Sequence, residues 1–181
     1  MMPFIILDRD GVVNYDSDEY IKSPDEWIAI PGSLDAIAEL NRHGYQVLVA
    51  TNQSGVARGF YDLEILDRIH EKFMQELAAV GGHVDEIFYC PHHPDEKCSC
   101  RKPQPGLFYQ MQQKYPLNLA ETYFIGDSLS DVQVARLVGC KPILVQTGKG
   151  EKTLAQHAEV AGVPYFPNLA KAVDYVLAQQ R

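Results

Sequence analysis

Two pairs of acidic residues follow apolar runs in this sequence. Asp8 and Asp10 come directly after the run 4–7, and side chains two residues apart on an extended chain point the same way. Two carboxylates this close repel each other, so the pair indicates a bound cation or a shared proton. An Asp-Gly step also suits an ordinary turn, but a turn does not require Asp8. Asp127 and Asp131 follow a later apolar run, at a spacing of one helical turn. A helix N-terminus favours an acidic residue, which accounts for one of these carboxylates more easily than for both.

Side chains suited to phosphate follow two other apolar runs. The string 51–55, Thr-Asn-Gln-Ser-Gly, offers a hydroxyl, amides and flexible backbone donors just before a helix. Arg101 and Lys102 place two cations ahead of another helix. Alone, the string also suits a helix cap or loop, and adjacent surface cations are commonly solvated. The combination, however, indicates phosphate chemistry far more specifically than any one of its motifs. In chain order it consists of a carboxylate pair, a hydroxyl, the cations and a second carboxylate pair.

A cluster of metal-binding side chains precedes these cations. Three cysteines and two histidines fall within eleven residues: Cys90, His92, His93, Cys98 and Cys100. Three thiolates and one imidazole complete a closed tetrahedral zinc site, and we expect His92 as the histidine ligand, with His93 as the alternative. Cys98 and Cys100 are too near each other for an easy disulfide. A filled site has no open coordination position, so the zinc of the loop 90–100 is expected to be structural. We expect it to fix the position of the segment that carries the two basic side chains after the loop.

The apolar runs alternate with helical patterns. Strands are predicted at 4–7, 46–50, 86–89, 123–125 and 143–145. Apolar residues at helical spacing predict helices over 34–40, 63–77, 107–111, 132–138 and 168–177. This alternation predicts an α/β fold, with a Rossmann-like, mostly parallel sheet and helices on both faces. In such a fold the chemistry lies at the carboxyl ends of the strands.

Composition limits the remaining possibilities. A chain of 181 residues, 46% hydrophobic and 22% charged, is expected to form one folded domain spanning 1–181. Its net charge of -8 disfavours a nucleic-acid partner. No apolar run approaches the about 20 residues of a membrane helix, and no secretory signal is evident, so we expect a cytoplasmic protein with no membrane partner. No helix has an unusually wide apolar face, and a monomer is therefore expected.

The residues at the strand ends together resemble the haloacid dehalogenase (HAD) superfamily of phosphohydrolases. The superfamily motifs match Asp8 to Gly11, Thr51, Lys102, and Asp127 with Asp131. The resemblance implies an HAD-like fold, and the intervals between motifs are filled by strands, helices and the zinc loop. We therefore expect a capless protein with an open site.

The resemblance also implies the chemistry of each matched residue. Asp8 would attack phosphorus and form an aspartyl-phosphate, while Asp10 would protonate the leaving alkoxide and then deprotonate water, a double role that calls for a pKa near the working pH. Thr51 and Lys102 would position and neutralise the phosphate. Mg2+ would be held by Asp8, the backbone carbonyl of Asp10, and Asp127, with Asp131 as an indirect or direct partner.

Within the superfamily, the strings 8–11, 51–59, 90–93 and 100–106 look like the heptose bisphosphate phosphatases. This implies a small sugar phosphate as substrate and hydrolysis of the C7 phosphate of D-glycero-D-manno-heptose 1,7-bisphosphate, a step that supplies heptose for lipopolysaccharide or surface-layer glycans. Loops must then recognise the sugar. The candidate substrate-binding residues are Asp16, Ser17, Asp18, Glu19, Asn52, Gln53, Ser54, Arg58, Arg101 and Ser128.

Three other functions fit the sequence less well. The short interval between His92 and Cys98 looks like the related histidinol-phosphate phosphatases, but the run 53–59 is closer to the heptose enzymes, and no apolar or acidic lining for an imidazole is evident. A polynucleotide 3'-phosphatase would need a basic track, which the sparse cations do not provide. A non-catalytic, zinc-stabilised binding module would have to treat the matched motif positions as accidental.

Overall fold

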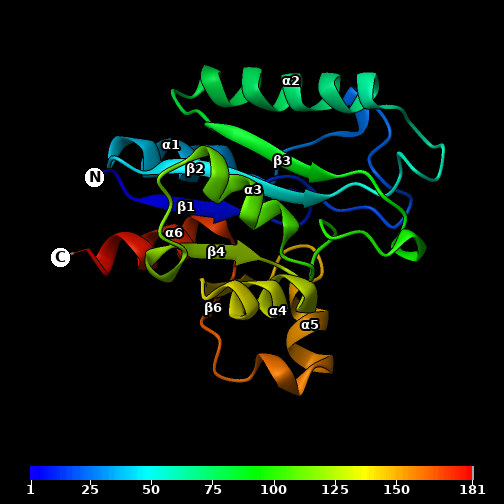
Figure 1. Ribbon diagram of the computed structural model, residues 1–181. Helices are drawn as coiled ribbons and strands as arrows, with labels where there is room; N and C mark the ends of the chain where they lie inside the picture. The colour runs from blue at the N-terminus through cyan, green and yellow to red at the C-terminus, as the bar shows by residue number, and fades with distance from the viewer. Residues whose placement is uncertain (181) are drawn as a thin grey trace.

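The computed structural model describes residues 1–180. It contains one sheet of six parallel strands (Figure 1). Its spatial order is β3-β2-β1-β4-β5-β6. The strands are β1 (Phe4–Leu7), β2 (Gln46–Asn52), β3 (Glu86–Cys90), β4 (Tyr123–Gly126), β5 (Lys141–Val145) and β6 (Tyr165–Phe166). The expected α/β fold with a parallel sheet is confirmed.

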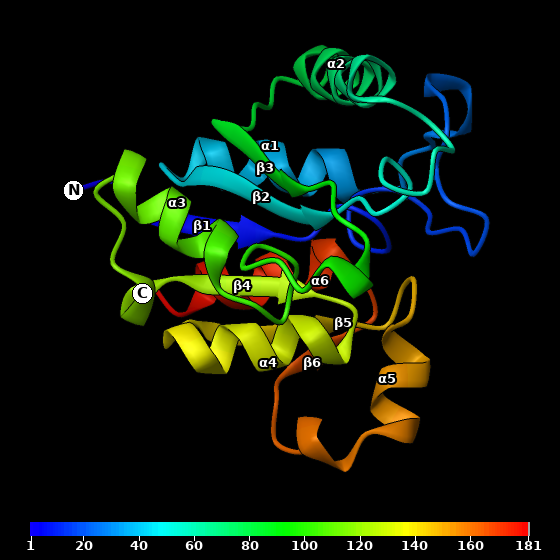
Figure 2. The ribbon, with the colours of Figure 1, turned by 45° about the vertical axis from the view of Figure 1, so that its right-hand side comes forward.

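Helices cover both faces of the sheet, as expected (Figure 2). The α-helices are α1 (Ser33–Arg42), α2 (Leu63–Ala79), α3 (Gly106–Lys114), α4 (Leu129–Val138), α5 (Gly150–Gln156) and α6 (Leu169–Ala178). Short 3-10 turns occupy Pro24–Glu26, Pro94–Glu96, Leu119–Glu121 and Ala158–Val160. The core on one face joins β1 and β2 to α1, α2 and α6, and the core on the other face joins them to α3 and α4. Across residues 1–180, no helix combines the length and apolar character needed to cross a membrane.

The alternating side chains of β1 fix where the strand ends. Ile5 and Leu7 pack into the first core and Ile6 into the second, and all three are fully buried. Burial of each such side chain contributes about 1.5–3 kcal/mol, and a shift of one residue would exchange the two faces. The strand is therefore held in register, and Asp8 emerges at its carboxyl end.

The order of the strands creates a crevice beside β1. From β1 the chain continues outward through β2 and β3 on one side, and β4 returns to pair with the other side of β1. The loops after β1 and β4 therefore diverge at the carboxyl edge, which is where α/β sheets bind ligands. This arrangement brings Asp8 next to Asp127.

Some element boundaries differ from the sequence-based prediction. Strand β2 continues through Thr51 and Asn52, because both residues pair with β3. Strand β6 and helix α5 were not predicted, since two and seven residues are too few to show a periodic pattern.

Candidate active site

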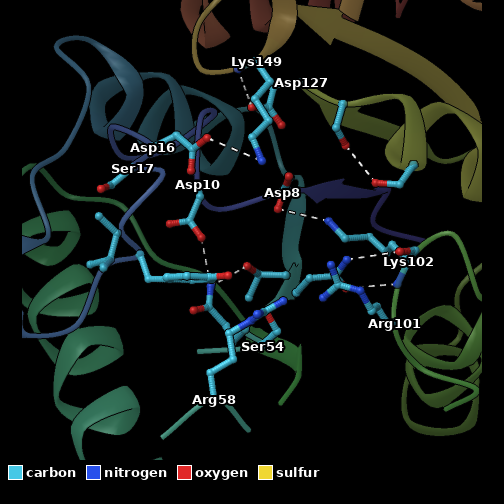
Figure 3. A pocket seen from close by; sticks show the side chains of 17 residues that line it. Asp8, Asp10, Asp16, Ser17, Ser54, Arg58, Arg101, Lys102, Asp127 and Lys149 are labelled. Atoms are coloured by element: carbon cyan, nitrogen blue, oxygen red, sulfur yellow. Dashed lines mark hydrogen bonds and ion pairs between the residues drawn. The ribbon is translucent and has the colours of Figure 1, made fainter. Parts of the chain in front are cut away.

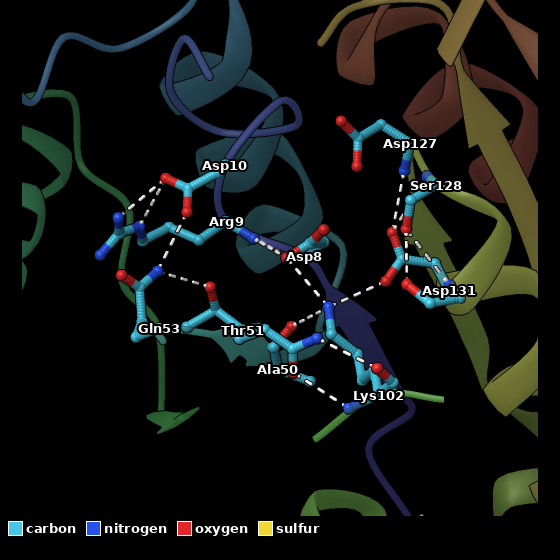
Figure 4. Close-up of polar contacts among 12 residues, drawn as sticks. Asp8, Arg9, Asp10, Ala50, Thr51, Gln53, Lys102, Asp127, Ser128 and Asp131 are labelled. Carbon is cyan, nitrogen blue, oxygen red and sulfur yellow. Dashed lines mark hydrogen bonds and ion pairs between the residues drawn. The ribbon is translucent and has the colours of Figure 1, made fainter. Parts of the chain in front are cut away.

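Asp8 lies beside a buried lysine from a distant part of the chain. Lys102 Nζ is 3.1 Å from Asp8 Oδ1 and 2.8 Å from Asp131 Oδ1, and it donates to the Ala50 carbonyl oxygen at 2.8 Å (Figure 4). These three acceptors match the three hydrogens of an ammonium group. Burial alone would lower the Lys102 pKa, but Asp131 and Asp8 raise it above its ordinary value. Lys102 is therefore a permanent cation at the floor of the site.

Three carboxylates crowd around this single cation. Oxygens of Asp8, Asp127 and Asp131 lie within 4.8 Å of one another. Burial, together with the charge of Asp131, raises the pKa of Asp8 well above its ordinary value and that of Asp127 to about 7. A divalent cation would relieve this repulsion, and carboxylate oxygens are ligands that Mg2+ prefers. The residues present therefore fit a magnesium site.

Asp131 is the most fully occupied of the three carboxylates. Its Oδ2 accepts from the backbone N–H groups of Asp127 and Ser128 at 3.1 and 3.2 Å, where it caps α4 together with the Ser128 side chain. Burial opposes its ionisation, but the charge and the hydrogen bond of Lys102 hold the Asp131 pKa below its ordinary value. Asp131 is thus already compensated by protein groups.

Gly11 allows the two acidic strand ends to approach. Its φ is +83°, a conformation that side chains rarely adopt. A Cβ at this position would lie 2.0 Å from Asp127 Oδ2. The Asp-Gly step is therefore required by the tertiary contact as well as by the turn.

Asp10 is held by a dense set of donors. Its Oδ1 accepts from Arg9 Nη2 at 2.8 Å and Asn14 Nδ2 at 2.9 Å, and its Oδ2 accepts from Gln53 Nε2 at 3.0 Å (Figure 4). The Arg9 guanidinium is fully buried and also contacts His70 Nε2 at 3.0 Å. Burial alone would raise the Asp10 pKa, but Arg9 and these hydrogen bonds lower it. The resting pKa therefore departs from the expectation of a value near the working pH.

A polar pocket opens over these groups, lined by 17 residues (Figure 3). The predicted residues that line it are Asp8, Asp10, Asp16, Ser17, Thr51, Asn52, Gln53, Ser54, Arg58, Arg101, Lys102, Asp127 and Ser128. Within the described chain, Asp18 and Glu19 do not line this pocket. They lie at the tip of a turn in which the Tyr20 N–H donates to the Ser17 carbonyl oxygen. The structure thus brings together most of the predicted site, but not the second half of that loop.

Two of the predicted substrate-binding side chains form hydrogen bonds within the protein. The Asn52 side chain donates to the Lys102 carbonyl oxygen at 3.2 Å and accepts from the Lys102 N–H at 3.0 Å. Gln53 donates to Asp10 and to Thr51 Oγ1 at 2.9 Å, and accepts from the Tyr61 hydroxyl. Both side chains line the pocket, but their hydrogen bonds hold other residues of the site in place.

Lys149 is a pocket residue that the sequence analysis missed. Its backbone N–H donates to Asp127 Oδ2 at 2.9 Å, and its Nζ lies 3.9 Å from Asp16 Oδ2. In Figure 3 it lies on the opposite side of Asp8 from Arg58 and Arg101. Its position just after β5 could have predicted it, since the carboxyl ends of parallel strands lie at one edge of the sheet, where ligands bind. Tyr20, Ile21 and Ser130 also line the pocket without having been predicted.

The cysteine cluster forms a compact set of metal-binding atoms next to the pocket. Atoms of Cys90, His92, Cys98 and Cys100 lie within 4.8 Å of one another. The sulfur atoms are separated by 2.9 to 3.7 Å, which is too long for a disulfide bond and close to the spacing around a tetrahedral zinc ion with bonds of about 2.3 Å. His93 instead accepts from the Asp95 N–H at the start of a 3-10 turn. The residues fit zinc, and the geometry favours His92.

Comparisons with known proteins show similarity to phosphatases along nearly the whole chain. Residues 99–172 match the family model described as HAD-hyrolase-like. The chain is 52% identical to D-glycero-beta-D-manno-heptose-1,7-bisphosphate 7-phosphatase of Bordetella bronchiseptica, over 98% of this chain and 99% of the relative. It is 50% identical to the Pseudomonas aeruginosa protein of the same name, over 96% and 97%. The crystal structure of D,D-heptose 1,7-bisphosphate phosphatase from B. bronchiseptica, complexed with magnesium and phosphate, has a TM-score of 0.95 at 52% identity, covering 98% of this chain and 99% of that chain.

Proposed function

The chain belongs to the D-glycero-beta-D-manno-heptose-1,7-bisphosphate 7-phosphatases, within the HAD-like hydrolases, and from this membership we propose how it acts. It is a phosphoric monoester hydrolase that depends on Mg2+ and removes the C7 phosphate of heptose 1,7-bisphosphate, giving heptose 1-phosphate and inorganic phosphate. The relatives are named for the β anomer, and we propose the same preference here. The observation that carries this function is the convergence of Asp8, Asp10, Lys102 and Asp127 on one crevice in a chain so similar to these enzymes along its length.

Asp8 is proposed as the nucleophile. The Arg9 N–H and Lys102 Nζ both contact its Oδ1, which orients the carboxylate and leaves Oδ2 for attack. Oδ2 forms a bond to phosphorus as the bond from phosphorus to the C7 oxygen breaks, and the product is an aspartyl-phosphate. Water then attacks this phosphorus, and the bond to Asp8 breaks to release phosphate.

Asp10 is proposed to move the protons. It gives a proton to the leaving C7 oxygen and then takes one from the attacking water. Its low resting pKa favours the second task. The negative charge of a bound phosphate beside it would raise that pKa and so favour the protonated form needed for the first. Thr51 is buried and lines the pocket, and we propose that it donates its hydroxyl hydrogen to a phosphate oxygen.

Mg2+, when bound, neutralises phosphate oxygens and the crowded carboxylates. We propose Asp8, Asp127 and the Asp10 backbone carbonyl as its ligands. Asp131 is proposed to act indirectly, because Lys102 and two backbone N–H groups already occupy its carboxylate.

A structural zinc is proposed for Cys90, His92, Cys98 and Cys100. Four protein ligands leave no open position for chemistry. The Arg101 N–H donates to Cys98 Sγ at 3.4 Å, so the cluster is tied directly to the segment that enters the pocket. We therefore propose that zinc holds this segment in place.

The pocket rim is proposed to select a bisphosphate. Arg58, Arg101 and Lys149 supply cations around the opening, which suits a substrate with a second phosphate better than histidinol phosphate, the alternative substrate. Asp16 and Ser17 are proposed to contact sugar hydroxyls. The same pocket, open and without a separate cap, supports one catalytic domain over 1–181, which we propose acts as a cytoplasmic monomer.

Phosphate release tests the function directly. Both anomers of heptose 1,7-bisphosphate and histidinol phosphate are compared with Mg2+, using wild type and Asp8→Asn. We expect the β anomer to be preferred and the activity to vanish in the folded variant. A preference for histidinol phosphate would overturn the substrate, and an active Asp8→Asn variant would overturn the nucleophile.

A further inference from the structure

A buried chain of polar side chains leads from Tyr61 to the proposed acid and base. We propose that Tyr61 is a positioning residue, which acts through Gln53 to set the orientation of Asp10 and Thr51. The inference rests on the proposed function, because it takes Asp10 as the group that moves protons. It also changes the role of Gln53 from substrate ligand to an internal support.

The hydrogen bonds run in one direction along this chain. The Tyr61 hydroxyl donates to Gln53 Oε1 at 2.6 Å. Gln53 Nε2 then donates one hydrogen to Asp10 Oδ2 at 3.0 Å and the other to Thr51 Oγ1 at 2.9 Å (Figure 4). An amide nitrogen has two hydrogens, so both are used.

Tyr61 determines which end of the Gln53 amide faces the active site. If the amide were reversed, its oxygen would face the Asp10 carboxylate, which accepts and does not donate when ionised. The Tyr61 hydroxyl stabilises the productive orientation by supplying the donor that Oε1 needs. Burial raises the pKa of Tyr61 to about 12, so the hydroxyl remains a donor through the neutral and mildly basic range.

Packing keeps the tyrosine in place. A Cβ on Gly55 would lie 2.3 Å from Tyr61 Cε1, so the ring rests directly against the glycine backbone. The exposed fractions are 7% for Tyr61, 3% for Gln53 and 1% for Thr51. Water therefore has little access to replace a lost hydrogen bond.

Asp10 depends on Gln53 for one specific oxygen. Arg9 and Asn14 both donate to Oδ1, whereas Gln53 is the only side-chain donor to Oδ2 within residues 1–180. Loss of the Gln53 contact would free the carboxylate to rotate about an anchored Oδ1. Such rotation misaligns proton transfer but leaves the cationic pocket rim unchanged, so the effect is expected in kcat and not in KM.

A double-mutant cycle with Tyr61→Phe and Gln53→Met tests the inference. Both changes keep the approximate shape of the side chain and remove its hydrogen bonds. Tyr61→Phe is expected to lower kcat about tenfold, the rate equivalent of one hydrogen bond, with KM within about twofold of wild type. Because Tyr61 acts through Gln53, adding Tyr61→Phe to Gln53→Met should change kcat little further. Tyr109→Phe, on an exposed ring of α3, is the matched control and should leave kcat unchanged.

The outcomes separate this inference from the proposed function. An active wild type in which Tyr61→Phe has normal kcat, or lowers kcat by the same factor in both backgrounds, overturns the inference alone. A wild type that prefers another phosphate ester overturns the substrate, and the same kcat ratios measured with that ester then decide the inference. A wild type inactive on every ester overturns both.

A spectroscopic measurement checks the contact in case a variant folds poorly. The side-chain amide hydrogens of Gln53, identified by their loss in Gln53→Met, should exchange slowly with solvent in wild type. Tyr61→Phe should accelerate this exchange at least about tenfold, because the amide loses the partner of Oε1. Equal exchange in a well-folded Tyr61→Phe protein would refute the coupling.

Discussion

Replacement of Lys102 by methionine tests the electrostatic balance of the site. The change keeps an unbranched side chain of similar length and removes the charge together with its three N–H donors. In the wild type the ammonium contacts two buried carboxylates, Asp8 at 3.1 Å and Asp131 at 2.8 Å. At an effective dielectric constant of about 20, each contact is worth about 5–6 kcal/mol before desolvation is subtracted.

The expected net loss is smaller than the sum of these contacts. Breaking a buried ion pair by removing one partner costs about 3–5 kcal/mol, and a domain has about 5–15 kcal/mol of total stability. Lys102→Met should therefore remain folded but be much less stable at pH 8. Phosphate release should also fall strongly, since Lys102 is proposed to neutralise the bound phosphate.

The loss should shrink in acid. Without Lys102, burial and mutual repulsion raise the pKa values of Asp8 and Asp131 above those of the unfolded chain, so the folded variant binds protons more readily than the unfolded one. The variant's stability then falls as pH rises through these raised pKa values. Its deficit relative to wild type should be larger at pH 8 than at pH 5.

Urea unfolding at both pH values, without added Mg2+, measures this difference. Lys114→Met is the matched control, because Lys114 pairs with Glu86 at an exposed position and its removal should change stability little. A deficit below about 1 kcal/mol for Lys102→Met at pH 8, or a deficit that grows on acidification, would refute the reasoning.

Three further predictions concern groups around the site. His70 has a pKa lowered to about 3 by burial and by Arg9, so it stays neutral when folded while the unfolded histidine protonates below about pH 6.5. His70→Gln should therefore weaken the fall in stability between pH 6.5 and 4 seen in urea unfolding, by at most about 1.4 kcal/mol per pH unit, and an unchanged profile would count against a buried neutral imidazole. Removal of zinc with a chelator, followed by excess Mg2+, should lower both phosphatase activity and melting temperature until zinc is restored, whereas full activity in protein shown to be zinc-free would exclude the proposed support of Arg101. Gly55→Ala should lower stability by about 1–3 kcal/mol through overpacking against Tyr61, and a melting temperature equal to wild type would show that the ring can move aside.

The strands and their polar ends could be read from the sequence because they depend on local spacing. Alternation within β1 sets which side chains face each core, and the residue after the last apolar one must emerge at the strand end. The same local geometry made the cysteine cluster recognisable, since its ligands fall within the short segment 90–100. The motif residues also carry the resemblance to the HAD superfamily, which the comparisons support.

Contacts between distant segments were decided by the tertiary structure. Strand order brings Lys102 between Asp8 and Asp131, and spacing in the sequence contains no information about that neighbour relation. Whether a polar side chain serves the substrate or the protein likewise depends on which partners surround it. Asn52 pairs with the Lys102 backbone and Gln53 bridges Tyr61 to Asp10, although the sequence suggested that both bind substrate. Residue types at strand ends thus establish the chemistry available, while sheet order and side-chain packing decide which of those groups meet.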